Sequence, residues 1–324
     1  MSDVLALISR RMRPGYSNDD DGAKLALVIE GGGMRGVVAG GMVTALDEYR
    51  LQGVFDMVIG SSAGALAGAY FLAEEPRMGT SIYYEDLVGK EWLSYRRALA
   101  GSPILAFDYL FDQLITHRKK LDCDRVLSSP VPLYVVATRV PEYRPIPLGN
   151  FQEPAQLVSA LRASTNIPLI AGRPVSLPSG EYIDGALTEA IPVSLAMKLG
   201  ATHMLVLLTR PRGKRRRPAG NIQRRVAFPA MNRIQPGLGD VCAERAPRYS
   251  QELALLDRIQ AGEVSQRAAL AIQLPPDAET IGLLEQDPEA LHDGAAAGAA
   301  AVREALPRAD VDPTPDLALE PAIG

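Results

Sequence analysis

Ser62 stands at the centre of Gly60-Ser-Ser-Ala-Gly64, which has the G-x-S-x-G pattern of a serine nucleophile. The apolar run Val54 to Ile59, typical of a buried strand, precedes this turn, and a helix-like run, Ala65 to Ala73, follows it. A serine on such a sharp turn exposes its hydroxyl, and the neighbours two positions away must be small so that strand and helix can pack. Gly60 and Gly64 meet this requirement, so Ser62 is the candidate nucleophile. A glycine-serine turn without chemistry is the alternative.

A second glycine-rich turn, Gly31-Gly-Gly-Met-Arg-Gly36, follows the apolar run Lys24 to Glu30 and precedes a helical pattern from Val37 to Arg50. This turn also fits the G-x-G-x-x-G pattern of dinucleotide-binding proteins. Those proteins carry an acidic residue about 20 positions further on, at the end of the second strand. Here that strand ends in the Ser62 turn. A dinucleotide-binding oxidoreductase is therefore an alternative function that this turn alone supports.

The two turns are expected to lie side by side, because consecutive parallel strands of a right-handed β-α-β unit are usually neighbours. Glycines expose backbone N–H groups, and N–H donors beside a nucleophile are what an oxyanion hole requires. We predict that the amides of Gly32, Gly33 and Met34 supply these donors. For Arg35, support of the loop and a direct electrostatic contribution to catalysis are both open.

The base that a serine nucleophile needs is predicted to be Asp184. This residue ends an apolar strand in Tyr182-Ile-Asp-Gly-Ala186, and Gly185 lets the chain turn directly after it. An Asp-Gly turn without a catalytic role is the alternative. Since an aspartate of ordinary pKa, about 3.9, is a weak base at neutral pH, the dyad needs a desolvated site. The three histidines are the alternative bases. His117 belongs to no motif, His203 opens a buried strand and His292 lies in the polar first turns of the last helix, which favours ordinary surface or core positions for them.

Taken in order, the Gly31 to Gly36 turn, the Gly60 to Gly64 turn and Asp184-Gly-Ala186 resemble the motifs of the patatin-like phospholipase family, bacterial type. Leu161-Arg-Ala-Ser164, followed by Ile167-Pro168, adds to the resemblance, which spans about Lys24 to Leu306. The family's frequent Asp-Gly-Gly is Asp-Gly-Ala here, with the aspartate and the first glycine retained.

The resemblance implies an α/β protein with a three-layer α/β/α fold and a mostly parallel central sheet. It implies a serine carboxylic-ester hydrolase that acts on lipid acyl esters, as a phospholipase A, lysophospholipase or esterase, through an acyl-enzyme and without a metal or cofactor. Carried over by position, Ser62 is the nucleophile, Asp184 the base, and Gly32, Gly33 and Met34 the oxyanion region. A catalytically silent lipid-binding protein of the same fold is a further alternative.

Strand and helix patterns alternate without linker composition, which predicts one hydrolase domain at residues 24–306. Residues 74–125 show no strand pattern and are expected to form a helical cap. Residues 210–225 are rich in Arg, Pro and Gly and are expected to form an exposed basic loop. We expect residues 1–23 to be a flexible tail rather than a basic amphipathic helix on a membrane, and residues 307–324 to be disordered.

The 324 residues carry a net charge of −4 and are 47% hydrophobic, which fits an ordinary globular protein and gives no sign of a polyanion-binding class. Cys123 and Cys242 form neither a disulfide framework nor a zinc motif. The N-terminus lacks a signal-peptide pattern, so a cytoplasmic location is predicted, with peripheral membrane contact through Arg210 to Arg217 as one option. No aromatic residue interleaves this basic run, so a nucleic-acid partner is not expected.

Overall fold

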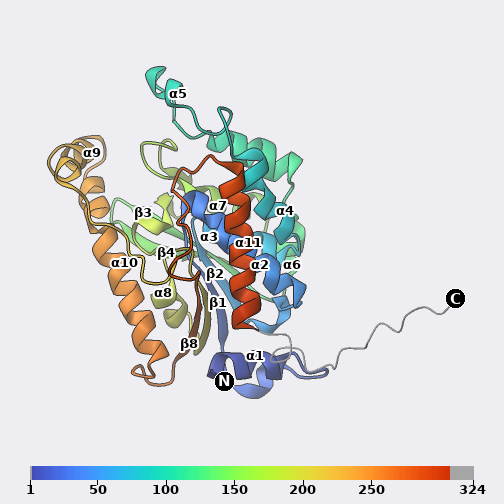
Figure 1. Cartoon of the computed structure of the whole chain (residues 1–324). Coiled ribbons are helices and arrows are strands. Elements are labelled where there is room, and N and C mark those ends of the chain that lie inside the picture. Colours follow the sequence, from blue (N-terminus) through green and yellow to red (C-terminus); the bar gives the residue numbers. More distant parts are fainter. Residues whose placement is uncertain (1, 307–324) are drawn as a thin grey trace.

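The computed structural model describes residues 2–306, and in them a central sheet lies between two layers of helices (Figure 1). The order of its eight strands is β5-β6-β3-β2-β1-β7-β8, and β4 also pairs with β3. The strands are β1 (Leu25–Ile29), β2 (Met57–Ser61), β3 (Leu133–Val140), β4 (Arg144–Leu148), β5 (Val175–Leu177), β6 (Gly180–Asp184), β7 (His203–Leu207) and β8 (Ala268–Ile272).

The centre of the sheet is parallel. Strand β1 pairs in parallel with β2 and β7, β2 with β3, and β7 with β8. Strands β4, β5 and β6 add antiparallel pairings at the β3 end. The prediction of a mostly parallel α/β/α protein is therefore confirmed.

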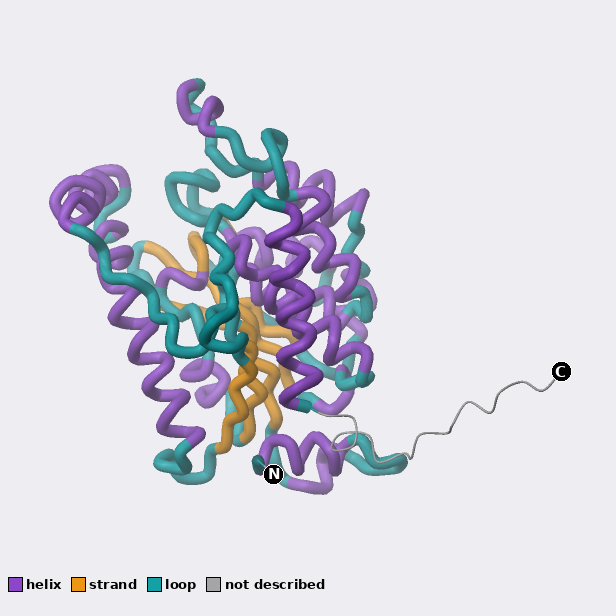
Figure 2. The backbone as a smooth tube through the Cα atoms, viewed as in Figure 1, coloured by secondary structure: helices purple, strands orange, loops and turns teal. Residues whose placement is uncertain are grey.

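Side chains of β1 alternate between two apolar cores, as the two-residue repeat of a strand requires. Leu25, Leu27 and Ile29 pack with α2 (Gly36–Glu48), α3 (Ala63–Leu72), α7 (Pro154–Thr165) and α11 (Pro288–Ala305). Ala26 and Val28 pack on the other face with α8 (Val193–Lys198) and α10 (Leu238–Gln260). Burial on both faces explains why this strand reads as a continuous apolar run, and Figure 2 shows the strands enclosed by the two helical layers.

Residues 74–125 are mainly helical. They contain α4 (Pro76–Ser81), α5 (Tyr95–Leu99), the start of α6 (Cys123–Ser128) and two π-helices, Ile82–Asp86 and Tyr109–Arg118. Between the two π-helices the chain forms an isolated bridge, Leu93 to Leu105, and α5 projects from the body of the molecule (Figure 1). Side chains from this cap line a cavity at Ser62 that is described below.

The expectation of a flexible tail at residues 1–23 is wrong for residues 2–23. Helix α1 (Asp3–Arg11) buries Val4 and Ile8 against the first core, so that neither side chain is exposed. Arg11 is also buried and forms ion pairs with Asp21, at 2.9 Å, and Asp56, at 2.7 Å. The tail folds because its apolar stripe and its one inward arginine both find partners in the domain. The predicted disordered tail at residues 307–324 lies outside the described residues.

The predicted basic loop at residues 210–225 is too long, because helical structure begins at residue 221 and continues through the π-helix Gln223–Ala227 into α9 (Phe228–Ile234). The uncharged run from Met57 to Ala73 forms β2, the Ser62 turn and α3. Among the helices of residues 2–306, none combines the length and the hydropathy that a membrane span requires.

Candidate active site

Strand β3 brings the two predicted catalytic residues together. Strand β2 runs parallel to β3 and ends with Ser61 opposite Val136. Strand β6 runs antiparallel to β3 and ends with Asp184 opposite Ala137. The two strands approach from opposite directions and stop at neighbouring positions of β3. Ser62, the residue after β2, therefore meets the last residue of β6.

The backbone of Ser62 has φ 54° and ψ −125°, a conformation rarely adopted by residues other than glycine. Its flanking glycines are required by close backbone contacts. A Cβ on Gly60 would lie 2.4 Å from the carbonyl oxygen of Gly64, and a Cβ on Gly64 would lie 2.5 Å from that of Ile29. The serine turn is thus as sharp as its sequence pattern predicts.

The Ser62 hydroxyl donates a hydrogen bond of 2.8 Å to Oδ2 of Asp184. The other carboxylate oxygen, Oδ1, accepts from the backbone amide of Ala186 at 2.7 Å. Both side chains are buried, with 4% of each residue exposed. The carboxylate is therefore held in one orientation with one oxygen aimed at the serine.

Burial raises the pKa of Asp184 above its ordinary value of 3.8. The hydrogen bond from Ser62, the charges of Arg245 and Arg216 and the amide of Ala186 act in the opposite direction and are outweighed. A carboxylate with a raised pKa is a stronger base than an ordinary one, which is the property that a Ser-Asp dyad requires.

The glycine turn lies next to the serine turn. Its first amide, on Gly31, donates to the carbonyl of Ala190 at 3.0 Å. The amides of Gly32 and Gly33 have no acceptor among residues 2–306, and Gly33 has a φ of 59°. The amide of Met34 instead donates to the carbonyl of Leu283 at 3.1 Å. The prediction for Met34 is therefore corrected: its amide is already occupied, whereas those of Gly32 and Gly33 are available.

Arg35 is almost fully buried, at 5% exposed, and its guanidinium makes a long contact of 3.4 Å with the carbonyl of Ile281. No bond to Ser62 or Asp184 accompanies this contact. Gly36, at the end of the turn, begins α2. The loop therefore leads directly into a helix.

Ser164 is a site residue that the sequence pattern did not identify by role. Its hydroxyl accepts a hydrogen bond of 2.8 Å from the amide of Ser62 and donates one of 2.5 Å to the carbonyl of Val136. It thereby ties the strained serine turn to β3. The resemblance included Leu161-Arg-Ala-Ser164 as a motif, and this contact supplies a structural reason for its serine.

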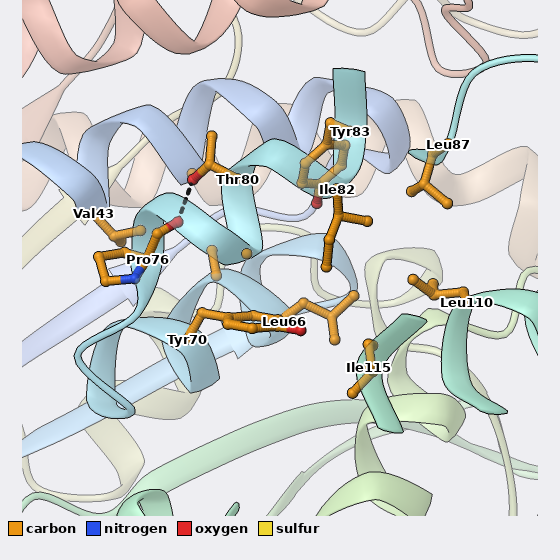
Figure 3. Close-up of a pocket in the computed structure, with 13 residues that line it drawn as sticks. Val43, Leu66, Tyr70, Pro76, Thr80, Ile82, Tyr83, Leu87, Leu110 and Ile115 are labelled. Atoms are coloured by element: carbon orange, nitrogen blue, oxygen red, sulfur yellow. Dashed lines mark hydrogen bonds between the residues drawn. The ribbon is translucent and has the colours of Figure 1, made fainter. Parts of the chain in front are cut away.

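An apolar cavity opens at Ser62, and the empty space in it and at its solvent-filled mouth is about 450 Å³. Cap residues Trp92, Leu105 and Phe107 line it, together with Leu283 from the segment before α11. Beyond it lies a second apolar cavity, between α2, α3 and the cap (Figure 3). The two cavities share four lining residues: Leu66, Tyr83, Leu87 and Leu110. Together they form an apolar path leading away from the serine.

None of the three histidines hydrogen-bonds to Ser62. His203 opens β7 and contacts the hydroxyl of Thr202, and His292 lies on α11 against the ring of Tyr84. His117 lies in the π-helix Tyr109–Arg118. The carboxylate of Asp184 is the hydrogen-bond partner of the serine hydroxyl in the part of the chain that the structure describes.

A family model described as patatin-like phospholipase matches residues 27–197. The uncharacterized protein YjjU of Escherichia coli K12 is 30% identical over 218 residues, which are 65% of this chain and 57% of YjjU. VipD from Legionella pneumophila aligns with 12% identity and a TM-score of 0.41, over 88% of this chain and 66% of the VipD chain. The chain thus spans less than two thirds of the length of either protein.

Proposed function

Because the chain belongs to the patatin-like phospholipase family, we propose that it is a hydrolase of lipid esters, and more closely a serine acyl hydrolase that uses Ser62 and Asp184 as a dyad. The observation that carries the proposal is the 2.8 Å hydrogen bond between the two side chains, made at a strained turn that opens into an apolar cavity. Phospholipase A, lysophospholipase and simple esterase activities are all compatible with this arrangement.

In the proposed reaction, Asp184 accepts the proton of the Ser62 hydroxyl while Oγ attacks the ester carbonyl carbon. The free amides of Gly32 and Gly33 stabilise the negative charge that develops on the carbonyl oxygen. The proton then passes to the alcohol as it leaves, and the acyl group remains on Ser62. Water, activated by the same carboxylate, releases the fatty acid. No metal or cofactor takes part in this sequence.

The proposal is tested by labelling with a fluorophosphonate, which reacts with activated serines, followed by peptide mapping. We expect the label on the peptide that contains Ser62 and turnover of acyl esters by the same preparation. Saturable binding of a dinucleotide, with no label on Ser62, would instead favour the oxidoreductase. A folded protein that neither labels nor turns over esters would be the catalytically silent lipid-binding protein.

The acyl chain is proposed to follow the two cavities beyond Ser62. Val43 lines only the second cavity, so Val43→Phe should shorten the path without touching the serine. Loss of contact for two methylene groups costs about 1.6 kcal/mol, or roughly tenfold in kcat/KM. We expect this loss for oleoyl esters and little change for butyryl esters.

The matched control is Val126→Phe, which makes the same change in a separate cavity between α6 and β3. It should leave the ratio of oleoyl to butyryl hydrolysis unchanged. An equal reduction of both esters in Val43→Phe, or an unchanged oleoyl rate in a folded variant, would contradict the proposed acyl path.

We also propose that the exposed basic residues after β7 contact the surface of an anionic bilayer. Arg212, Lys214, Arg215 and Arg217 are exposed, and Ile222, just beyond them, is 80% exposed. Basic and apolar side chains presented together favour contact with anionic lipid. We expect the protein to sediment with phosphatidylserine vesicles and less so with phosphatidylcholine vesicles, and Ile222→Asp to weaken the binding. Equal sedimentation with both vesicles would argue against the electrostatic contact.

A further inference from the structure

The charges of four arginines act on one another, and two of the four, Arg216 and Arg245, also act on Asp184 of the proposed dyad. Arg35 belongs to the glycine turn, Arg210 and Arg216 to the segment after β7, and Arg245 to α10. The charges of the other three act on Arg216, and those of Arg210 and Arg245 act on Arg35. Burial is the largest cause that lowers the pKa of Arg216 to about 9 and that of Arg35 to about 10, and the neighbouring positive charges add to it.

These arginines lack carboxylate partners. None of the four forms an ion pair within residues 2–306. The Nε atoms of Arg35, Arg210 and Arg245 are buried and have no hydrogen-bond acceptor in the part of the chain that the structure describes. The charge of Glu30 acts on the cluster, but this carboxylate accepts a 2.6 Å bond from the amide of Thr209.

Arg35 is buried and the other three arginines are partly buried. Cations that are withdrawn from water without an ion-pair partner are costly unless an anion compensates them. Guanidinium groups match phosphate especially well, because their planar N–H donors pair with two phosphate oxygens at once. The basic run contributes only one of its three consecutive arginines to the cluster. Arg216 is partly buried, whereas its neighbours Arg215 and Arg217 are exposed. Arg216 is therefore set apart from the exposed arginines on either side of it.

The arginines and the acyl cavities approach Ser62 from different sides. The cavities are lined by α3, the cap and the segment before α11. Arg210 and Arg245 come from the other side of the sheet, where α10 packs, and the Arg210 guanidinium lies 5.5 Å from the centre of the Tyr249 ring of α10. The charges of Arg216 and Arg245 also reach Asp184. An ester at Ser62 would thus have its acyl chain on one side and its alcohol part toward the arginines.

We propose that Arg35, Arg210, Arg216 and Arg245 form a phosphate-binding site that holds a phosphate ester carried on the alcohol part of the substrate. This inference rests on the proposed function, because the phosphate is placed relative to the ester at Ser62. In a glycerophospholipid the phosphate is only a few bonds from the ester carbonyl. The site would make the protein prefer phosphorylated lipid esters to neutral ones.

The test compares two substrates that differ only in the phosphate, 1-oleoyl lysophosphatidate and 1-oleoylglycerol, in uncharged detergent micelles. The readout is the ratio of their kcat/KM values, in which any effect on the dyad itself cancels. We expect the ratio to favour the phosphorylated ester and to fall about tenfold in Arg216→Gln and in Arg245→Gln. The exposed matched controls, Arg215→Gln and Arg217→Gln, should keep the ratio within twofold.

Binding is measured separately by calorimetric titration of the Ser62→Ala variant with glycerol 3-phosphate and with inorganic phosphate. Tighter binding of glycerol 3-phosphate, lost with Arg216→Gln, supports the proposal even if no ester is hydrolysed, in which case only the proposed function fails. Equal binding of inorganic phosphate without an ester preference would assign the site to free phosphate and overturn the head-group proposal. A ratio that is unchanged in folded Arg216→Gln and Arg245→Gln, or reduced equally in the exposed controls, would also overturn it.

Discussion

Replacing Ser62 with alanine is expected to reduce ester hydrolysis by at least about 10³-fold and to abolish fluorophosphonate labelling. Removal of a serine nucleophile has effects of this order or larger, and only the oxyanion donors and substrate binding remain. The fold should persist, because the substitution removes one hydroxyl and leaves the amide of Ser62 bonded to Ser164. Initial rates with an oleoyl ester and a thermal melt measure the two quantities.

The chain offers a matched control one residue away. Ser61 is fully buried, and its hydroxyl has no hydrogen-bond partner in the described residues. Ser61→Ala removes a buried hydroxyl that makes no bond, so it should be neutral or slightly stabilising and should keep the activity. Retained turnover in Ser62→Ala, or labelling that moves from Ser62 to another serine, would show that the nucleophile is wrongly assigned.

Asp184→Asn is expected to reduce hydrolysis by about 10³-fold or more while leaving the protein folded. The asparagine can still accept a hydrogen bond from Ala186 but cannot accept the proton of Ser62. Since the pKa of Asp184 is raised by burial, activity should also fall on acidification at a pH above 3.8, where a carboxylate of ordinary pKa would still be ionised. A pH profile of kcat/KM measures this acidic limb.

The same pKa shift predicts how stability depends on pH. A carboxyl group whose pKa is raised on folding favours the folded state in its protonated form, and this contribution is lost as pH rises from 3.8 through the folded pKa. The asparagine variant is neutral throughout. It should therefore match the wild type below about pH 4 and be the more stable protein at neutral pH. An Asp184→Asn variant that is active, or that is less stable only at neutral pH, would contradict the proposed base.

The serine turn was predictable because its requirements are local. A sharp turn between strand and helix leaves no room for side chains at the two flanking positions. Both positions are glycine, Gly60 and Gly64, so the requirement can be recognised from the residue types. The same holds for β1, whose continuous apolar run reflects burial on both faces. Asp184 could be proposed from its strand end, but its distance from Ser62 could not be known, because it depends on two strands stopping at adjacent positions of β3.

Other features depended on contacts between segments far apart in the chain. Helix α1 folds because Arg11 finds Asp56, and the amide of Met34 is occupied because Leu283 lies across the glycine turn. Asp56 and Leu283 lie far along the chain from Arg11 and Met34, so the local sequence pattern does not reveal these contacts.

The sequence by itself therefore determined the α/β class, the two glycine turns and the candidate dyad, since the backbone conformation at each turn is limited by neighbouring side chains. Only the tertiary structure decided that Ser164 holds the serine turn and that Gly32 and Gly33, rather than Met34, have free amides. It also separated the inward Arg216 from the outward Arg215 and Arg217. The physical reason is that hydrogen-bond partners and buried charges are set by packing between distant segments, which a local pattern does not constrain.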